Sequence, residues 1–190
     1  MVSETRPALR IEVRRPQRAD ARRNFDALLA AARDAFASKG TEASLEDIAR
    51  HAGVGIGTLY RNFPTRQDLL KAVYLGEIEE LCLAAEDVAD LPPWEALSTW
   101  LRRFVAYAAT KRAINESLNR EAPVFSEARE AMYAAGTPLF GRAQEAGEAR
   151  KDMSFDDLLR LVSGLTSCAF VDDEQRERVL QIALDGVRTR

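Results

Sequence analysis

Histidine and cysteine are scarce in this chain of 190 residues, which has one histidine, His51, and two cysteines, Cys82 and Cys168. A metal site needs several such ligands at suitable spacings, and these three residues form no cluster in the sequence. The lone histidine also disfavours a nucleophilic triad. We therefore expect no metal, no cofactor and no enzyme. The cysteines are interpreted as small buried side chains in a reducing compartment, with a disulfide or redox switch as the alternative.

Long apolar runs are also missing. No stretch reaches the roughly 18 residues needed to span a membrane, and residues 1–7 lack the apolar segment of a secretory signal. The chain has 46% hydrophobic and 30% charged residues, which is typical of an ordinary globular protein. These features favour a cytoplasmic protein without a membrane partner.

The net charge of −3 conceals an uneven distribution. Residues 1–66 contain 12 Lys and Arg against 8 Asp and Glu, a balance of +4, whereas residues 67–190 contain 15 against 22, a balance of −7. A basic front half indicates a polyanionic partner for that half only. Residues 1–19 combine prolines with several arginines, and we expect a flexible basic arm there. The arm either follows DNA or only keeps the protein in solution.

Apolar residues recur at three- and four-residue steps along the rest of the chain, and no strand-like alternation of useful length is present. The pattern predicts an all-α fold. About nine helices are expected, near residues 20–38, 45–52, 56–62, 64–88, 94–108, 114–118, 123–149, 155–170 and 174–189. A polar kink at residues 110–112 is expected to separate the fifth helix from the sixth.

Residues 44–63 have the pattern of two short helices joined by a tight turn. Gly53 permits a left-handed backbone in that turn. Ile48, Val54 and Leu59 are expected to form a wedge that fixes the two helices at a steep angle. Such a wedge leaves the outer face of the second helix available to the major groove of DNA. The arrangement predicts a helix-turn-helix.

The run from Arg22 to Leu81, about a third of the chain, resembles the DNA-binding domain of the tetracycline-repressor (TetR) family. The matching features are Ala31, Ala32, Phe36, Gly40, residues 44–49, 52–54, 57–63 and 65–70. Residues 57–63, Gly-Thr-Leu-Tyr-Arg-Asn-Phe, are the most specific part. The resemblance implies a helix-turn-helix domain over residues 20–66 and a helical effector-binding and dimerisation domain over residues 67–190. It also implies a homodimeric regulator, expected to be a repressor that a small-molecule effector releases from a palindromic double-stranded DNA operator.

Carried over by position, the resemblance implies a set of DNA contacts. Ile56, Gly57 and Thr58 would face the floor of the groove, and Tyr60 would reach a phosphate. The full set is Arg22, Arg23, Ser44, Gly55, Ile56, Gly57, Thr58, Tyr60, Arg61, Asn62, Thr65 and Arg66. Three members depart from the family pattern, in which Ser or Thr, His and Lys are common at positions 55, 62 and 66. Because Gly55 and Gly57 carry no side chains, few residues can contact the bases directly. Recognition of the shape of the DNA is therefore expected to matter more.

The remaining half offers candidates for an effector pocket and for a dimer interface, both implied by the resemblance. The pocket candidates, for which core packing is the alternative interpretation, are Trp100, Phe104, Tyr107, Phe125, Met132, Phe140 and Cys168. The interface is expected to use the last two helices, which would form a four-helix contact with a second copy. Its candidates are Leu158, Val162, Leu165, Ala169, Val179, Ile182 and Ala183.

Three other functions are compatible with parts of the pattern. A regulator of the same fold could activate transcription or act without a ligand, and the sequence does not distinguish these from ligand-controlled repression. An enzyme is disfavoured, because the lone histidine lies within the helix-turn-helix and no phosphate-binding loop is present. A helical interaction module without DNA binding is disfavoured by the basic front half and by the intact run Thr58-Leu59-Tyr60.

Overall fold

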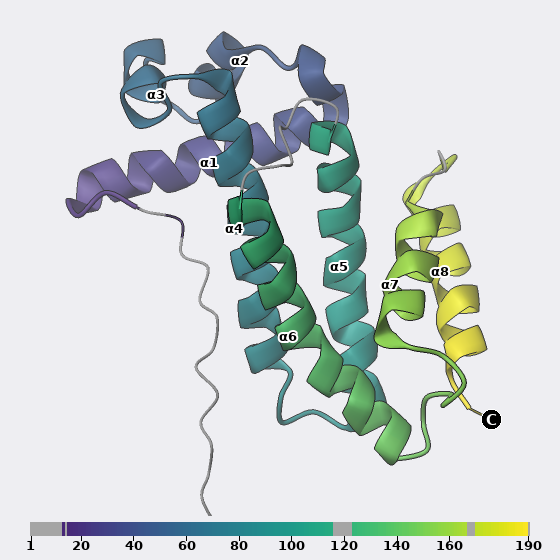
Figure 1. The fold of residues 1–190 in the computed structure, drawn as a ribbon. Helices are drawn as coiled ribbons and strands as arrows, with labels where there is room; N and C mark the ends of the chain where they lie inside the picture. The colour runs from purple at the N-terminus through teal and green to yellow at the C-terminus, as the bar shows by residue number, and fades with distance from the viewer. Residues whose placement is uncertain (1–12, 14, 116–122, 167–169, 190) are drawn as a thin grey trace, which may run out of the picture.

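The computed structural model describes residues 13, 15–115, 123–166 and 170–189. Over these residues the chain forms eight α-helices and one short 3-10 helix, with no β-strand (Figure 1). The elements are α1 (Ala19–Lys39), η1 (Gly40–Glu42), α2 (Leu45–His51), α3 (Ile56–Asn62), α4 (Arg66–Asp87), α5 (Pro93–Asn115), α6 (Pro123–Glu145), α7 (Phe155–Leu165) and α8 (Asp173–Val187). The predicted all-α fold is confirmed. None of these helices is long and apolar enough to cross a membrane.

Two details of the predicted helix pattern are wrong. The expected kink at residues 110–112 does not interrupt α5, which continues to Asn115. The Thr-Lys-Arg sequence there contains no helix breaker, since Lys and Arg are good helix formers and Thr costs only a few tenths of a kcal/mol. The helix expected to extend to about residue 170 ends earlier, at Leu165. Residues 116–118, the rest of the expected short sixth helix, lie outside the described part of the chain.

The buried side chains gather in two clusters that meet on α4. The first is formed by α1, α2, α3 and the beginning of α4, where it includes Leu70 and Val73. The second is larger and includes Tyr74 and Ile78 of α4 together with side chains of α5, α6, α7 and α8. Leu75 packs against both. In Figure 1, α4 runs from the helix-turn-helix at one end into the helical body below it, so that one helix contributes to both cores.

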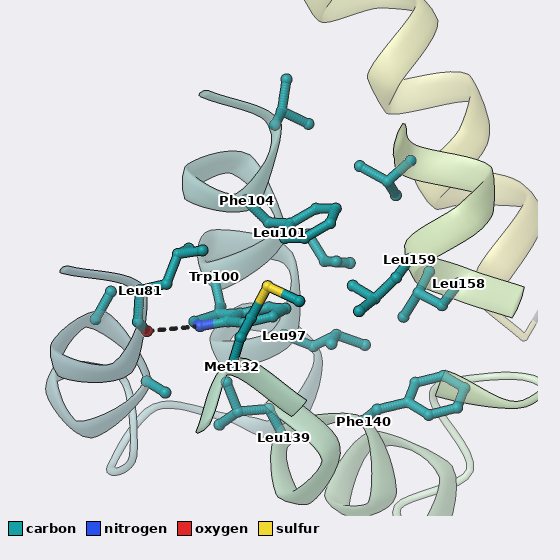
Figure 2. Packing of buried hydrophobic residues seen from close by; sticks show 14 of the residues in the cluster. Leu81, Leu97, Trp100, Leu101, Phe104, Met132, Leu139, Phe140, Leu158 and Leu159 are labelled. Atoms are coloured by element: carbon teal, nitrogen blue, oxygen red, sulfur yellow. Dashed lines mark hydrogen bonds between the residues drawn. The ribbon is translucent and has the colours of Figure 1, made fainter. Parts of the chain in front are cut away.

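Trp100 of α5 lies in the middle of the larger cluster (Figure 2). Its side chain is fully buried, and its indole Nε1–H donates a 3.0 Å hydrogen bond to the carbonyl oxygen of Leu81 on α4. Phe104, one turn further along α5, stacks on it with ring centroids 5.8 Å apart. This hydrogen bond fixes the indole in one orientation and joins α5 to α4, because a buried N–H donor needs a partner.

Candidate nucleic-acid interface

The turn between α2 and α3 has the geometry that the sequence predicts. Ser44 is the N-cap of α2, and its Oγ accepts a hydrogen bond from the backbone N–H of Asp47 at 3.2 Å. Gly53 has a φ of +70°, a left-handed conformation that favours glycine. Ile48 and Leu59 are buried between the helices. The two short helices are therefore fixed against each other and against α1.

The outer face of α3 carries two large side chains that are exposed to solvent. Ile56 is 37% exposed and Tyr60 46%, and as residues four apart on a helix they lie on the same face. Gly57, one residue after Ile56, is exposed as well, and a Cβ there would meet no atom within 4 Å. In Figure 1, α3 lies at the extremity of the molecule, away from the helical body. This face can approach a flat or grooved partner closely.

Two polar side chains of α3 fold back on their own helix. The Nη2 of Arg61 donates to the Oγ1 of Thr58 at 3.0 Å, and its Nε donates to the carbonyl oxygen of Gly57 at 3.3 Å. The Nδ2 of Asn62 donates to the carbonyl oxygen of Thr58 at 2.8 Å. Arg61 is exposed, so its positive charge is accessible from solvent, whereas Asn62 is half-buried. Gly55, the N-cap of α3, provides no capping side chain.

Thr65 and Arg66, the expected phosphate-binding pair, both make contacts inside the domain. Thr65 and Asp68 form a capping box at the start of α4, in which Thr65 Oγ1 accepts from the backbone N–H of Asp68 at 3.1 Å and Asp68 Oδ2 accepts from the backbone N–H of Thr65 at 3.0 Å. The Nη1 of Arg66 donates to the carbonyl oxygen of Ala43 at 2.7 Å, and its guanidinium lies over the ring of Phe36, 5.3 Å from the centroid. Sequence position alone did not indicate these internal contacts.

In the described part of the N-terminal segment, Val13 and Arg15 contact the helices, whereas a flexible arm was expected over residues 1–19. The side chain of Val13 is buried. Arg15 donates two hydrogen bonds to Glu79 of α4, at 2.7 and 3.0 Å, and one to Asp26 of α1 at 3.0 Å. These charge-assisted bonds hold the partly exposed side chain of Arg15 against α1 and α4. Residues 1–12 and 14 lie outside the described residues.

Arg22 and Arg23, the remaining cations expected at the interface, lie on the exposed surface of the first turns of α1. Arg23 forms an ion pair with Asp20, and the Nε of Arg22 donates to the carbonyl oxygen of Pro16 at 3.5 Å. Because both side chains are exposed, these contacts are weak and can be exchanged for a phosphate.

A second set of ion pairs joins α1 to the middle of α4. Arg33 of α1 pairs with Glu77 and, at 2.6 Å, with Glu80. Burial raises the pKa of the Glu77 carboxyl, against the opposing effect of the positive charge of Arg33. Together with the contacts of Arg15 to Asp26 and Glu79, these ion pairs connect the DNA-binding domain to the helix that both cores share.

The pocket candidates of the C-terminal half pack closely against one another. Trp100, Phe104, Tyr107, Met132 and Phe140 are all buried in the larger cluster, and Phe125 is half-buried against it. Core packing, the alternative interpretation, therefore describes all six in this structure. Tyr74 of α4 belongs to the same aromatic group and was missed. Its ring centroid lies 5.1 Å from that of Phe125, and its position four residues after Leu70 on the apolar side of α4 was the available signal. Cys168 lies outside the described residues.

Cys82 lies on α4 and is half-buried with a free thiol. Burial, and then the nearby carboxylates of Glu86 and Glu79, raise the pKa of this thiol. A raised thiol pKa keeps the sulfur protonated and unreactive near neutral pH. The placement is consistent with a small, partly buried packing residue.

The dimer-interface candidates divide into an inward and an outward set. Leu158 and Val162 are fully buried within the larger cluster. Their side chains therefore face their own subunit, and the expectation that they meet a second copy is corrected. Leu165, Val179 and Ala183 are half-buried, and Ile182 is 70% exposed. Two exposed apolar residues near them were missed, Leu161 on α7 and Val171 just before α8. Ala169 lies outside the described residues.

A compact helix-turn-helix with an open second helix, joined through a shared long helix to an all-helical body, defines a class of DNA-binding regulators. The family model described as bacterial regulatory proteins of the tetR family matches residues 28–73. A second model, described as the C-terminal domain of SbtR-like transcriptional regulators, matches residues 92–189. The chain belongs to the TetR family of transcriptional regulators, and it is a DNA-binding protein rather than an enzyme.

Solved structures support the same assignment along nearly the whole chain. A TetR transcriptional regulator from Streptomyces coelicolor is 40% identical, with 86% of this chain and 97% of that chain covered and a TM-score of 0.74. A TetR regulatory protein from Mycobacterium vanbaalenii is 34% identical, with coverages of 92% and 100% and a TM-score of 0.70. A curated helix-turn-helix-type transcriptional regulator of Staphylococcus aureus is 32% identical over 77 residues, which are 39% of this chain and 40% of the length of that protein.

Proposed function

We propose that this protein represses transcription by binding a palindromic operator as a homodimer, and that a small molecule bound in the C-terminal domain releases it. The observation that carries the DNA-binding part is the open face of α3, where Ile56 and Tyr60 are exposed side by side next to the bare backbone of Gly57. Large apolar side chains that are exposed together on one face of a helix are suited to an interaction site. On a recognition helix, they suit contact with thymine methyl groups and sugar edges.

Electrostatics supports the same surface. Arg61 lies on α3, and Arg22 and Arg23 lie at the beginning of α1, all three exposed. Phosphate contacts of this kind position a protein on DNA, while side chains at the groove floor determine sequence. Tyr60 is suited to donate its hydroxyl to a phosphate, and Thr58, held by Arg61, presents its methyl and hydroxyl groups near the centre of the helix.

The homodimer is supported by apolar residues that α7 and α8 leave exposed. Ile182 on α8 and Leu161 on α7 are the largest of them, and Leu165, Val179 and Ala183 are partly covered on the same two helices. A second copy that covers this surface by a twofold axis would form a four-helix interface. Two recognition helices related in this way would meet half-sites about one turn of DNA apart.

Ligand control is supported by the position of α4. Its first turns belong to the DNA-binding core and its later turns to the larger core. A ligand that favours one arrangement of the larger core would therefore shift α4, and with it the spacing between the two recognition helices. The aromatic side chains around Tyr107 and Phe125 pack against one another in this structure, and a ligand that separated them would find an apolar lining. Because coupling is reciprocal, ligand and operator must weaken each other by the same factor. As a bacterial DNA-binding regulator, the protein would act in the cytoplasm.

The decisive experiment measures binding of the purified protein to genomic duplexes that flank its own gene, over a series of salt concentrations. We expect one palindromic duplex to bind tightly, with a logarithmic affinity that falls steeply with the logarithm of salt concentration. Tyr60→Ala should weaken binding to that duplex by about tenfold or more. Arg102→Met is the matched control, because it removes an exposed cation of α5 that pairs with Glu177 of α8.

Two outcomes would contradict the proposal. Equal binding to every duplex, with affinity independent of salt, would favour the interaction-module alternative. The other is selective binding to one duplex that is not weakened by any small molecule, although thermal-shift measurements on the same library identify compounds that bind the protein. That result would indicate a regulator that acts without a ligand.

A further inference from the structure

We propose that Arg66 is a positioning residue for the DNA-binding helices and not a phosphate contact, which departs from the role implied by its place in the family pattern. Arg66 is the first residue of α4, and its Nη1 donates a 2.7 Å hydrogen bond to the carbonyl oxygen of Ala43. Ala43 is buried and directly precedes Ser44, the N-cap of α2. The inference rests on the proposed DNA-binding function, since it concerns how the recognition surface is held.

The second contact of Arg66 is with α1. Its guanidinium lies over the ring of Phe36, 5.3 Å from the centroid, and Phe36 is fully buried. One side chain thus joins the beginning of α4 to α1 and to the chain entering α2. An arginine can make both contacts together, because its planar group donates hydrogen bonds at its edge while its face stacks on a ring. A lysine ammonium in the same place would make the hydrogen bond without the same stacking.

The position of Arg66 on α4 gives no electrostatic reason of its own for a cation. The N-terminus of a helix carries partial positive charge, which disfavours a cation in the first turn. Asp68 in the same turn suits the dipole, but its carboxylate is engaged with Thr65 in the capping box. The start of a helix therefore does not explain a cation at position 66. The hydrogen bond to the carbonyl oxygen of buried Ala43 does explain it.

The contact bears on the recognition helix through α2. Ile48 of α2 and Leu59 of α3 are buried in the same cluster, so a shift at the start of α2 is transmitted to α3. Arg66 limits that shift from the side of α4. Loss of Arg66 should loosen α2 in the free protein and weaken operator binding without removing a phosphate contact.

The test compares wild type with Arg66→Met, Arg66→Lys and the control Arg102→Met. The first measurement is amide hydrogen exchange of residues 45–62 in the free protein. The second is the slope of log affinity against log salt for the tightest genomic duplex and for a random-sequence duplex of equal length. We expect Arg66→Met to exchange faster in α2 and to bind the genomic duplex about tenfold more weakly, the equivalent of one hydrogen bond, with an unchanged salt slope. Arg66→Lys should recover part of both losses.

A salt slope that is lower by about 0.9 in Arg66→Met, with unchanged hydrogen exchange, would show that Arg66 contacts a phosphate and would overturn the inference. Unchanged exchange together with an unchanged slope would overturn it as well. If wild type binds neither duplex, the proposed function fails, and hydrogen exchange in the free protein still decides whether Arg66 positions α2.

Discussion

The carboxylate of Glu77 on α4 forms an ion pair with the guanidinium of Arg33 on α1. Glu77 is only 7% exposed and is the one buried charged residue in the described part of the chain, whereas Arg33 reaches the surface and also pairs with Glu80. The pair lies at the junction between the two cores, on the helix that belongs to both. Its energetics therefore bear on how firmly the DNA-binding domain is attached.

Removal of Arg33 should destabilise the protein strongly. In Arg33→Met the carboxylate of Glu77 would remain buried without its partner, a change that costs about 3–5 kcal/mol in buried pairs. We expect a loss near about 3 kcal/mol, since Arg33 is partly exposed, and for a chain of this size that lowers Tm by roughly 6–12 °C. Urea and thermal unfolding measure both quantities.

Two controls define the origin of that loss. Arg23→Met removes the exposed pair with Asp20 and should cost less than about 1 kcal/mol. The double variant Arg33→Met with Glu77→Met replaces the pair by apolar side chains and should recover most of the stability. A double variant as unstable as Arg33→Met alone would indicate that packing of the Arg33 stem, and not the stranded charge, accounts for the loss.

Glu77 also predicts a specific dependence of stability on pH. Burial raises the pKa of its carboxyl in the folded protein above the ordinary value near 4.5. Between the two values the folded protein holds a proton that the unfolded chain has lost, so the contribution of Glu77 to stability falls as pH rises through this window. Relative to Glu77→Gln, which does not titrate, wild type should lose stability from about pH 4.5 upward until the raised pKa is passed.

Urea unfolding of wild type and Glu77→Gln over a pH series measures this difference. The negative charge of Glu80 contributes to the raised pKa, so in a Glu80→Gln background the fall in stability should be smaller and should end at a lower pH. If the stability of wild type relative to Glu77→Gln instead increases with pH, attraction to Arg33 outweighs burial and the pKa of Glu77 is lowered.

The helix-turn-helix could be predicted from the sequence because its determinants are local. The Ser44 cap, the left-handed Gly53 and the Ile48–Leu59 contact all lie within 16 residues of one another along the chain. Each is a property of a short segment with a strong conformational preference. Family resemblance over the same segment added the roles of the exposed residues.

Contacts between distant segments were not predictable in the same way. Arg15 and Glu79 are 64 residues apart, and Arg66 and Ala43 are 23 apart. A long, flexible cation gives no local signal for its partner. Two interface candidates on α7, Leu158 and Val162, were wrong for a related reason: apolar periodicity identifies an apolar side of a helix, but only packing shows that Leu158 turns into the subunit while Leu161 stays exposed.

The hydroxyl of Tyr60 is expected to contribute to operator affinity without contributing to stability. Tyr60 is exposed on α3, so Tyr60→Phe should change the free energy of unfolding by less than about 0.5 kcal/mol. Loss of a hydrogen bond to a phosphate costs about 1.5–3 kcal/mol, which weakens binding roughly tenfold to hundredfold. Fluorescence anisotropy with the tightest genomic duplex measures the change, and the salt slope should stay constant because a neutral group is removed. Wild-type affinity in Tyr60→Phe with weak binding in Tyr60→Ala would assign the contact to the ring.

Gly136 on α6 is expected to resist substitution, in contrast to Gly141 on the same helix. A Cβ at Gly136 would lie 2.6 Å from Cη2 of Trp100 and would also overlap the ring of Phe155. Trp100 cannot move aside freely, because its indole is hydrogen-bonded to Leu81. Overpacking of this kind costs about 1–3 kcal/mol, and the higher helix propensity of alanine returns only about 0.5–1 kcal/mol.

Gly136→Ala should therefore be destabilising by urea unfolding. Gly141→Ala should stabilise by about 0.5–1 kcal/mol, because a Cβ at that position meets no atom within 4 Å. Near-ultraviolet circular dichroism, which reports the environment of Trp100, should change in the first variant and not in the second. Equal stabilisation by both substitutions would show that α6 can move away from α5 at little cost, and that the larger core is less tightly packed around Trp100 than its contacts indicate.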